Sequence, residues 1–293
     1  MAAVRPHTLH SLGPVHPPKV EKRAIKPSIA RHVNIRVNDP LDHDAPAILH
    51  EPRSYSAVEA KESAVVLVSG AGGGVSGPSG IYASLGDKLA LLLGIPCIRL
   101  DYRRPARTEY CSADIVASFT YLRKHFNSSS FVLVGWSFGG SPCFTVAAQQ
   151  PECVRGVATV ASQTAQTAGI QKLSPRPVLL LHGTDDTVLS PTCSETLYRE
   201  YGNGPRELKL LPGDDHGLTK HAPEVEKMIF EFAAKTLGFE KLLNQQPMVL
   251  DQAGEDLVES RDERIREMGE GHDLEGGERL RRDVCRAKPN LEA

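Results

Sequence analysis

The segment Phe131-Val-Leu-Val-Gly135-Trp136-Ser137-Phe138-Gly139-Gly140 joins an apolar run to a glycine-rich turn. Consecutive apolar residues such as Phe131–Val134 are typical of a strand that is buried on both faces of a parallel sheet. The Gly135-x-Ser137-x-Gly139 pattern then predicts a tight turn between this strand and a helix, because flanking glycines let the backbone bend. The serine hydroxyl on such a turn stands clear at the edge of the sheet.

The spacing of this motif is weak evidence by itself, because glycine and serine are common in the chain. The residues on either side of the motif are stronger evidence. An apolar strand precedes the turn, and the stretch after it has small residues at Ser141, Ala147 and Ala148, as a closely packed helix would. Both are conditions that the motif requires.

The rest of the chain alternates strand-like and helix-like stretches. Such alternation predicts an α/β fold, with a mostly parallel central sheet and helices on both faces. From apolar periodicity we expect strands at Val33–Val37, Ala47–His50, Ala64–Val68, Pro96–Leu100, Phe131–Val134, Val154–Val160, Val178–Leu181 and Glu207–Leu211, and helices at Ile81–Leu93, Asp114–His125, Ser141–Gln150 and Pro223–Leu237.

Two loops after later strands carry the groups that would activate a serine. A serine hydroxyl needs a base within hydrogen-bond reach and a carboxylate that orients this base. His182-Gly-Thr-Asp185-Asp186 follows one buried strand and offers a carboxylate, and Gly213-Asp214-Asp215-His216 follows the next and offers an imidazole. Because the carboxyl ends of parallel strands share one edge, these groups can converge on Ser137.

From about Val33 to Phe239 the sequence resembles members of the α/β-hydrolase superfamily, through the serine turn and the two loops just described. The resemblance implies that Ser137 is the nucleophile, Asp186 the acid and His216 the base. Asp186 matches the family's acid, four residues after the histidine of its HG pair, and Asp185 is the alternative. The implied activity is that of a carboxylesterase-like serine hydrolase, acting on an ester, thioester, amide or related bond.

The oxyanion that forms during such a reaction needs N–H donors. The amide of Phe138, next after the serine, is one candidate. The loop Ser69–Gly74 follows an expected strand and would supply the second. By the resemblance, Ala71 matches the usual donor position and Gly72 the next, while Ser69 replaces a common histidine and leaves the loop's geometry open.

The same glycine-rich loop permits a different function. Gly72-x-Gly74-x-x-Gly77 satisfies the G-x-G-x-x-G pattern of dinucleotide-binding proteins, and Asp101 ends the next expected strand. Against this alternative, the first motif glycine lies several residues beyond its strand, and residues 78–80 extend the loop where a helix should have begun. A non-catalytic binding module on a hydrolase scaffold is a further alternative.

The lengths of the connections between the expected elements indicate which kinds of substrate could reach the serine. From Ser137 to Asp186 is 49 residues, and after the expected elements only Gln163–Ser174 remains. We therefore expect no inserted helical lid and an open site for small or soluble acyl substrates. The two-step acyl transfer needs no cofactor and no metal.

The amino-acid composition limits the kinds of binding partner and the cellular location that we expect for this protein. The chain has 34 Lys+Arg against 36 Asp+Glu, and this near balance argues against a nucleic-acid partner. We expect no membrane span, because no apolar run reaches about 18 residues. The six cysteines form no CxxC pair, which favours a reducing, cytoplasmic setting.

We divide the chain into a flexible basic arm over residues 1–32, a hydrolase domain over 33–239 and a charged, disordered or partly helical tail over 240–293. The arm is poor in acids, so organelle targeting is an alternative to a cytoplasmic location. The sequence identifies no partner for either tail.

Overall fold

The computed structural model describes residues 28–41, 43–52, 54–245 and 249. Its strands form one eight-stranded sheet in the order β1-β2-β4-β3-β5-β6-β7-β8. Strands β3 to β8 run parallel, whereas β1 and β2 are antiparallel to their neighbours. The strands are β1 Ser28–Ile35, β2 Ala45–Pro52, β3 Ser63–Val68, β4 Cys97–Leu100, β5 Ser130–Trp136, β6 Val154–Val160, β7 Val178–Gly183 and β8 Arg206–Leu211.

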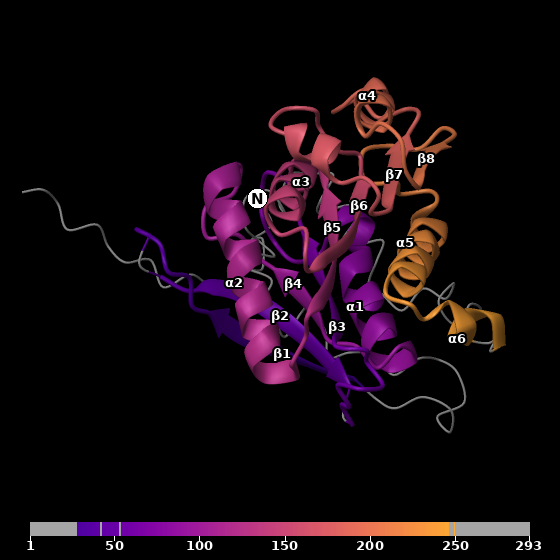
Figure 1. The fold of residues 1–293 in the computed structure, drawn as a ribbon. Coiled ribbons are helices and arrows are strands. Elements are labelled where there is room, and N and C mark those ends of the chain that lie inside the picture. Colours follow the sequence, from indigo (N-terminus) through magenta and orange to yellow (C-terminus); the bar gives the residue numbers. More distant parts are fainter. Residues whose placement is uncertain (1–27, 42, 53, 246–248, 250–293) are drawn as a thin grey trace, which may run out of the picture.

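Helices cover both faces of this sheet, as Figure 1 shows. Alternate strand residues divide the core between the two faces: Val66 and Val68 pack on the side of α2, α3 and α4, and Val65 and Leu67 on the side of α1, α5 and α6. The predicted α/β fold class is confirmed. The helices are α1 Ile81–Leu92, α2 Thr108–Phe126, α3 Gly140–Gln149, α4 Thr192–Glu200, α5 Ala222–Thr236 and α6 Glu240–Gln245, with short 3₁₀ helices η1 Pro78–Gly80, η2 Ser137–Gly139 and η3 Ala168–Lys172.

The first strand of the sheet differs from its sequence-based bounds, and α2 begins six residues before its expected start. Strand β1 begins at Ser28, inside the range 1–32 that was predicted as an arm. Its residues 29–32 are half polar and partly or fully exposed, because β1 is an edge strand, so apolar periodicity did not reveal them. A cross-strand contact of 2.8 Å from Arg31 Nε to Glu51 Oε1 holds this end against β2.

Helix α4 was not expected. It buries Ser194 and Leu197, and Tyr201 follows as its buried C-cap. One apolar residue in nine gives too weak a periodicity to predict a helix. Its importance lies in its contact with the loop after β7, described below.

The connection between β6 and β7 contains no inserted lid. All of its residues are described, and Gln163–Ser174 holds only η3. A Cβ on Gly169 would lie 2.3 Å from the carbonyl oxygen of Phe144, so η3 lies directly on α3. The expectation of a short connection is confirmed. Among the described residues, no helix is long and apolar enough to cross a membrane.

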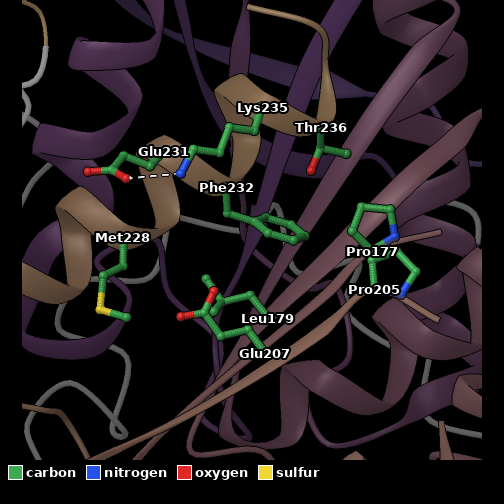
Figure 2. A pocket seen from close by; sticks show the side chains of 9 residues that line it. All are labelled: Pro177, Leu179, Pro205, Glu207, Met228, Glu231, Phe232, Lys235 and Thr236. Atoms are coloured by element: carbon green, nitrogen blue, oxygen red, sulfur yellow. Dashed lines mark hydrogen bonds and ion pairs between the residues drawn. The ribbon is translucent and has the colours of Figure 1, made fainter. Parts of the chain in front are cut away.

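A groove of about 420 Å³ lies at the amino ends of β7 and β8, beside α5 (Figure 2). Leu179, Met228 and Phe232 contribute apolar side chains to it, and Glu231 pairs with Lys235 at 3.3 Å. None of the predicted site residues lines this groove, because they lie at the opposite, carboxyl ends of the strands.

Candidate active site

Ser137 lies where β5 ends and η2 begins, with a φ of 54°. This left-handed conformation is unfavourable for a residue with a side chain, and the close packing around the turn maintains it. A Cβ on Gly135 would lie 2.5 Å from the Gly139 carbonyl oxygen, and a Cβ on Gly139 would lie 2.6 Å from that of Ser69. The two motif glycines are therefore required for the turn to fold back on its own strand and on the loop after β3.

The structure brings together the three side chains that the sequence singled out. His216 Nε2 lies 3.0 Å from Ser137 Oγ, and His216 Nδ1 lies 2.7 Å from Asp186 Oδ2. These residues come from the ends of β5, β7 and β8, which are separated in sequence and share one edge of the sheet. The resulting chain of contacts runs from hydroxyl to imidazole to carboxylate.

Asp186, and not Asp185, contacts the imidazole. Its side chain is buried, and its Oδ1 accepts hydrogen bonds from the amides of Val188 at 2.8 Å and Leu189 at 2.9 Å. Asp185 is exposed and accepts a hydrogen bond from Thr184 Oγ1. The backbone turn after Asp186 therefore orients this carboxylate toward His216.

The loop that carries His216 is held from two sides. The indole Nε1–H of Trp136, the residue before the serine, donates to the His216 carbonyl oxygen at 3.1 Å. The buried carboxylate of Asp214 accepts from the amides of Lys220 and His221. The position of the imidazole thus depends on the strand that bears the serine as well as on its own loop.

The loop Ser69–Gly74 lies directly beside the serine turn. A Cβ on Gly70 would be 3.4 Å from the Cβ of Ser137. Within the described part of the chain, no group accepts a hydrogen bond from the amides of Ala71 and Gly72. The amide of Gly74 donates to Asp101 Oδ1 at 3.0 Å. The Asp101 carboxylate therefore binds this loop, whereas a dinucleotide-binding protein would use it to bind a ribose.

The continuation of the loop also disfavours the dinucleotide alternative. Residues 73–80 are buried, and a Cβ on Gly77 would lie 2.3 Å from the ring of Tyr82. Ser79 Oγ donates to the Gly217 carbonyl oxygen at 2.8 Å, so the segment after β8 covers the start of α1. A pyrophosphate would need that helix terminus to be accessible.

Two contacts in this region were not predicted from the sequence. His182, the histidine of the HG pair, has its Nε2 3.1 Å from Asp186 Oδ2. The indole of Trp136, the residue before the serine, hydrogen-bonds to the loop that carries His216. The HG pair was a signal for His182, but nothing in the sequence indicated which way its ring points.

Comparison with known proteins bears on the fold. A family model described as the alpha/beta hydrolase fold matches residues 64–176. This range includes most of β3, the Ser69–Gly74 loop and the serine turn, and it ends before Asp186 and His216. A search of curated proteins found no match.

Several solved structures share the fold at low sequence identity. Est1E from Butyrivibrio proteoclasticus is 16% identical, with a TM-score of 0.58 over 70% of this chain and 98% of that one. A dienelactone hydrolase from Anabaena variabilis is 16% identical, with a TM-score of 0.59 over 70% and 96%. An alpha-beta serine hydrolase homologue from Coxiella burnetii is 18% identical, with a TM-score of 0.54 over 71% and 97%. The family model over residues 64–176 and these solved structures together show that the chain has the α/β-hydrolase fold.

Proposed function

We propose that this protein is a serine hydrolase that cleaves an ester, thioester or related acyl bond through an acyl-enzyme on Ser137. The observation that carries the proposal is the continuous contact chain from Ser137 Oγ through the His216 imidazole to Asp186. Its distances of 3.0 and 2.7 Å are those that a nucleophile, a base and an orienting acid require.

The reaction begins when Ser137 Oγ attacks the acyl carbon and its proton passes to His216 Nε2. His216 then gives this proton to the departing alcohol or thiol, and the acyl group stays on Ser137. In the second step His216 takes a proton from water, the hydroxide attacks the acyl carbon, and the carboxylic acid leaves as the proton returns to Ser137.

Asp186 keeps the imidazole in the tautomer that presents an unprotonated Nε2 to the serine. The developing oxyanion would accept hydrogen bonds from the amide of Phe138 and from that of Ala71 or Gly72. The close approach of Gly70 to Ser137 supports this role for the loop, because it brings the loop's backbone next to the nucleophile.

The substrate class follows from the open edge of the sheet. Within the described residues, the connection between β6 and β7 holds only η3 and no helical lid, which supports the approach of a small or soluble acyl substrate to Ser137. Est1E has been solved with ferulic acid bound, so an aromatic ester belongs in the substrate panel. We expect short-chain p-nitrophenyl esters to be cleaved faster than long-chain triglyceride droplets.

A fluorophosphonate probe tests the proposal directly, because it reacts with activated serines. We expect the wild-type protein to be labelled and Ser137→Ala to lose all labelling. Ser54→Ala is the matched control, because Ser54 is exposed and away from the carboxyl edge of the sheet. Absence of labelling in folded wild-type protein would contradict the proposal and favour a non-catalytic binding module.

A further inference from the structure

His182 is a second histidine that contacts the carboxylate of Asp186. It belongs to β7, and its side chain is completely buried. Its Nε2 lies 3.1 Å from Asp186 Oδ2 and 3.0 Å from the Leu189 carbonyl oxygen. On the other side of the ring, its Nδ1 lies 2.7 Å from Oγ of Ser194, a buried residue of α4.

These partners determine which ring nitrogen carries the proton. Both groups that face Nε2 are acceptors, so Nε2 must be protonated to bond either of them. Nδ1 then has a free lone pair and accepts the hydroxyl hydrogen of Ser194. Burial lowers the pKa of His182, so the ring is neutral, and the neighbouring Leu189 carbonyl and Asp186 only partly oppose this effect.

The Nε2–H group completes the set of donors around Asp186. Oδ1 accepts from the amides of Val188 and Leu189, and Oδ2 receives His216 with His182 beside it. Leu189 therefore takes part twice, since its amide donates to Asp186 and its carbonyl faces His182. The carboxylate cannot rotate away from His216 without losing several of these bonds at once.

We propose that His182 is a positioning residue for the proposed hydrolase site: as a neutral, Nε2-protonated ring oriented by Ser194, it fixes the Asp186 carboxylate in the orientation that holds His216. This inference rests on the proposed function, because it assigns His182 a role in the same reaction. His182 is not a second general base, since both of its ring nitrogens are occupied by partners other than Ser137.

Substitution of His182 by Phe and by Gln separates positioning from simple space filling. His182→Phe keeps a ring of similar size but removes both polar groups, whereas the amide of His182→Gln retains a donor and an acceptor. With p-nitrophenyl acetate we expect His182→Phe to lower kcat by about tenfold to a hundredfold, as loss of a hydrogen bond to a charged group does. KM should stay within about twofold, and His182→Gln should recover most of kcat.

The role of Ser194 is tested by a double-mutant cycle. Ser194→Ala should lower kcat by about threefold to tenfold in the wild-type background, the cost of one neutral hydrogen bond. It should have no further effect in the His182→Phe background, because Ser194 acts only through the ring. Ser190→Ala is the control, since Ser190 is exposed and precedes α4 in the same connection.

A measurement on the wild-type protein does not depend on activity. Nitrogen NMR of the imidazole rings should show His182 neutral and protonated at Nε2 from pH 6 to 8. A ring protonated at Nδ1 would overturn the proposal. This test and the Gln and Ser194 variants remain decisive even where His182→Phe does not fold.

The outcomes distinguish the two proposals. Reactive wild-type protein together with folded His182→Phe of unchanged kcat would overturn the role of His182 and leave the proposed function intact. Equal loss of kcat in His182→Phe and His182→Gln, with both folded, would show that only the ring's shape matters and would also overturn it. Wild-type protein that does not react with the fluorophosphonate overturns the proposed function itself.

Discussion

Among the described residues, two groups of polar side chains differ in how they are buried, one at the carboxyl edge of the sheet and one beneath α1. The first, which we term the Asp186 cluster, consists of Ser137, His182, Asp186, Ser194 and His216. The second, which we term the α1 cluster, consists of Ser28, His50, Ser84, Asp87, Lys88, Arg99 and Glu226, all of which are buried.

In the Asp186 cluster each oxygen of the buried carboxylate faces two donors. The His216 side chain is 16% exposed, so one end of the chain of contacts reaches the surface. The buried carboxylate therefore contacts a group that a substrate can approach.

The α1 cluster is closed to solvent. Lys88 Nζ pairs with Glu226 Oε1 at 3.0 Å, with side chains 1% and 0% exposed, and Ser28 donates to Asp87. The ring of His50 packs beneath α1 so closely that a Cβ on Gly86 would lie 2.8 Å from it. Helix α1 therefore covers these groups directly.

Hydrogen bonding within the α1 cluster is incomplete among the described residues. Both ring nitrogens of His50, Oγ of Ser84 and Oδ2 of Asp87 have no hydrogen-bond partner there. Burial lowers the pKa of His50 well below its usual value and raises the pKa of Asp87 to about 7. The comparison shows that burial shifts the pKa values of His50 and Asp87 toward the neutral form where hydrogen-bond partners are lacking, whereas both oxygens of Asp186 have a full set of donors.

The largest effect that we expect comes from Asp186→Asn. An amide in place of the carboxylate would favour the wrong tautomer of His216 and should lower kcat by about a thousandfold to ten-thousandfold. Steady-state kinetics with p-nitrophenyl acetate would measure this. Asp185→Asn is the matched control at an exposed neighbour and should change kcat by less than about twofold. The opposite ranking of the two variants would assign the acid to Asp185.

In the α1 cluster we expect a substitution to lower the stability of the folded protein, whereas Asp186→Asn lowers kcat. Lys88→Met removes the buried ion pair between Lys88 and Glu226 and should lower the free energy of unfolding by about 3–5 kcal/mol. Urea denaturation would measure it. Lys235→Met breaks a pair whose side chains are 55% and 28% exposed, and it should change stability by no more than about 1 kcal/mol. Equal effects of the two substitutions would mean that burial of the Lys88 pair is unimportant.

The pH dependence of stability tests Asp87. An unfolded aspartate titrates near pH 3.9, whereas burial raises the pKa of Asp87 in the folded protein to about 7. Between these values the folded state binds more protons than the unfolded chain, so the contribution of Asp87 to stability falls as the pH rises from about 4 to about 7. Above pH 7 this contribution is constant.

Asp87→Asn removes this titration while keeping a polar group next to Ser28. The stability of the variant relative to wild type should therefore increase from pH 4 to pH 7 and then level off. Urea denaturation at several pH values would measure the difference. A difference that does not vary with pH would contradict the raised pKa of Asp87.

The smallest effect that we expect comes from Trp136→Phe. The variant loses the hydrogen bond from the indole to the His216 carbonyl oxygen, and its free energy of unfolding should fall by about 1 kcal/mol. We expect kcat to fall severalfold, because the loop that carries His216 is less well held. Circular dichroism must follow the unfolding, since Trp136 is the protein's single tryptophan. Unchanged stability and kcat would show that the other contacts of this loop suffice.

Much of the fold could be predicted because the signals are local. The apolar run Phe131–Val134 and the glycines at 135 and 139 specify a buried strand and a tight turn within ten residues of chain. Edge strand β1 and helix α4 were harder to predict from the sequence. Half of the residues of β1 and most of those of α4 are polar, and the positions of both elements depend on the neighbours that cover them.

Within the candidate site, the residue types and their strand-end positions could be predicted, but not their contacts. Asp185 and Asp186 are adjacent and chemically identical, and only the turn at Val188 and Leu189 directs one of them toward His216. The ring orientation of His182 depends on Ser194, in a helix that the sequence did not indicate.

The sequence by itself determined the alternation of strands and helices, the turn at Ser137 and the order of the serine, acid and histidine loops, because each of these depends on residues close together in the chain. The tertiary structure alone decided which carboxylate meets the imidazole, which donors surround it and which charges lie buried beneath α1. Those outcomes depend on contacts between elements far apart in sequence, because the packing of these elements sets the burial and the hydrogen-bond partners of each side chain.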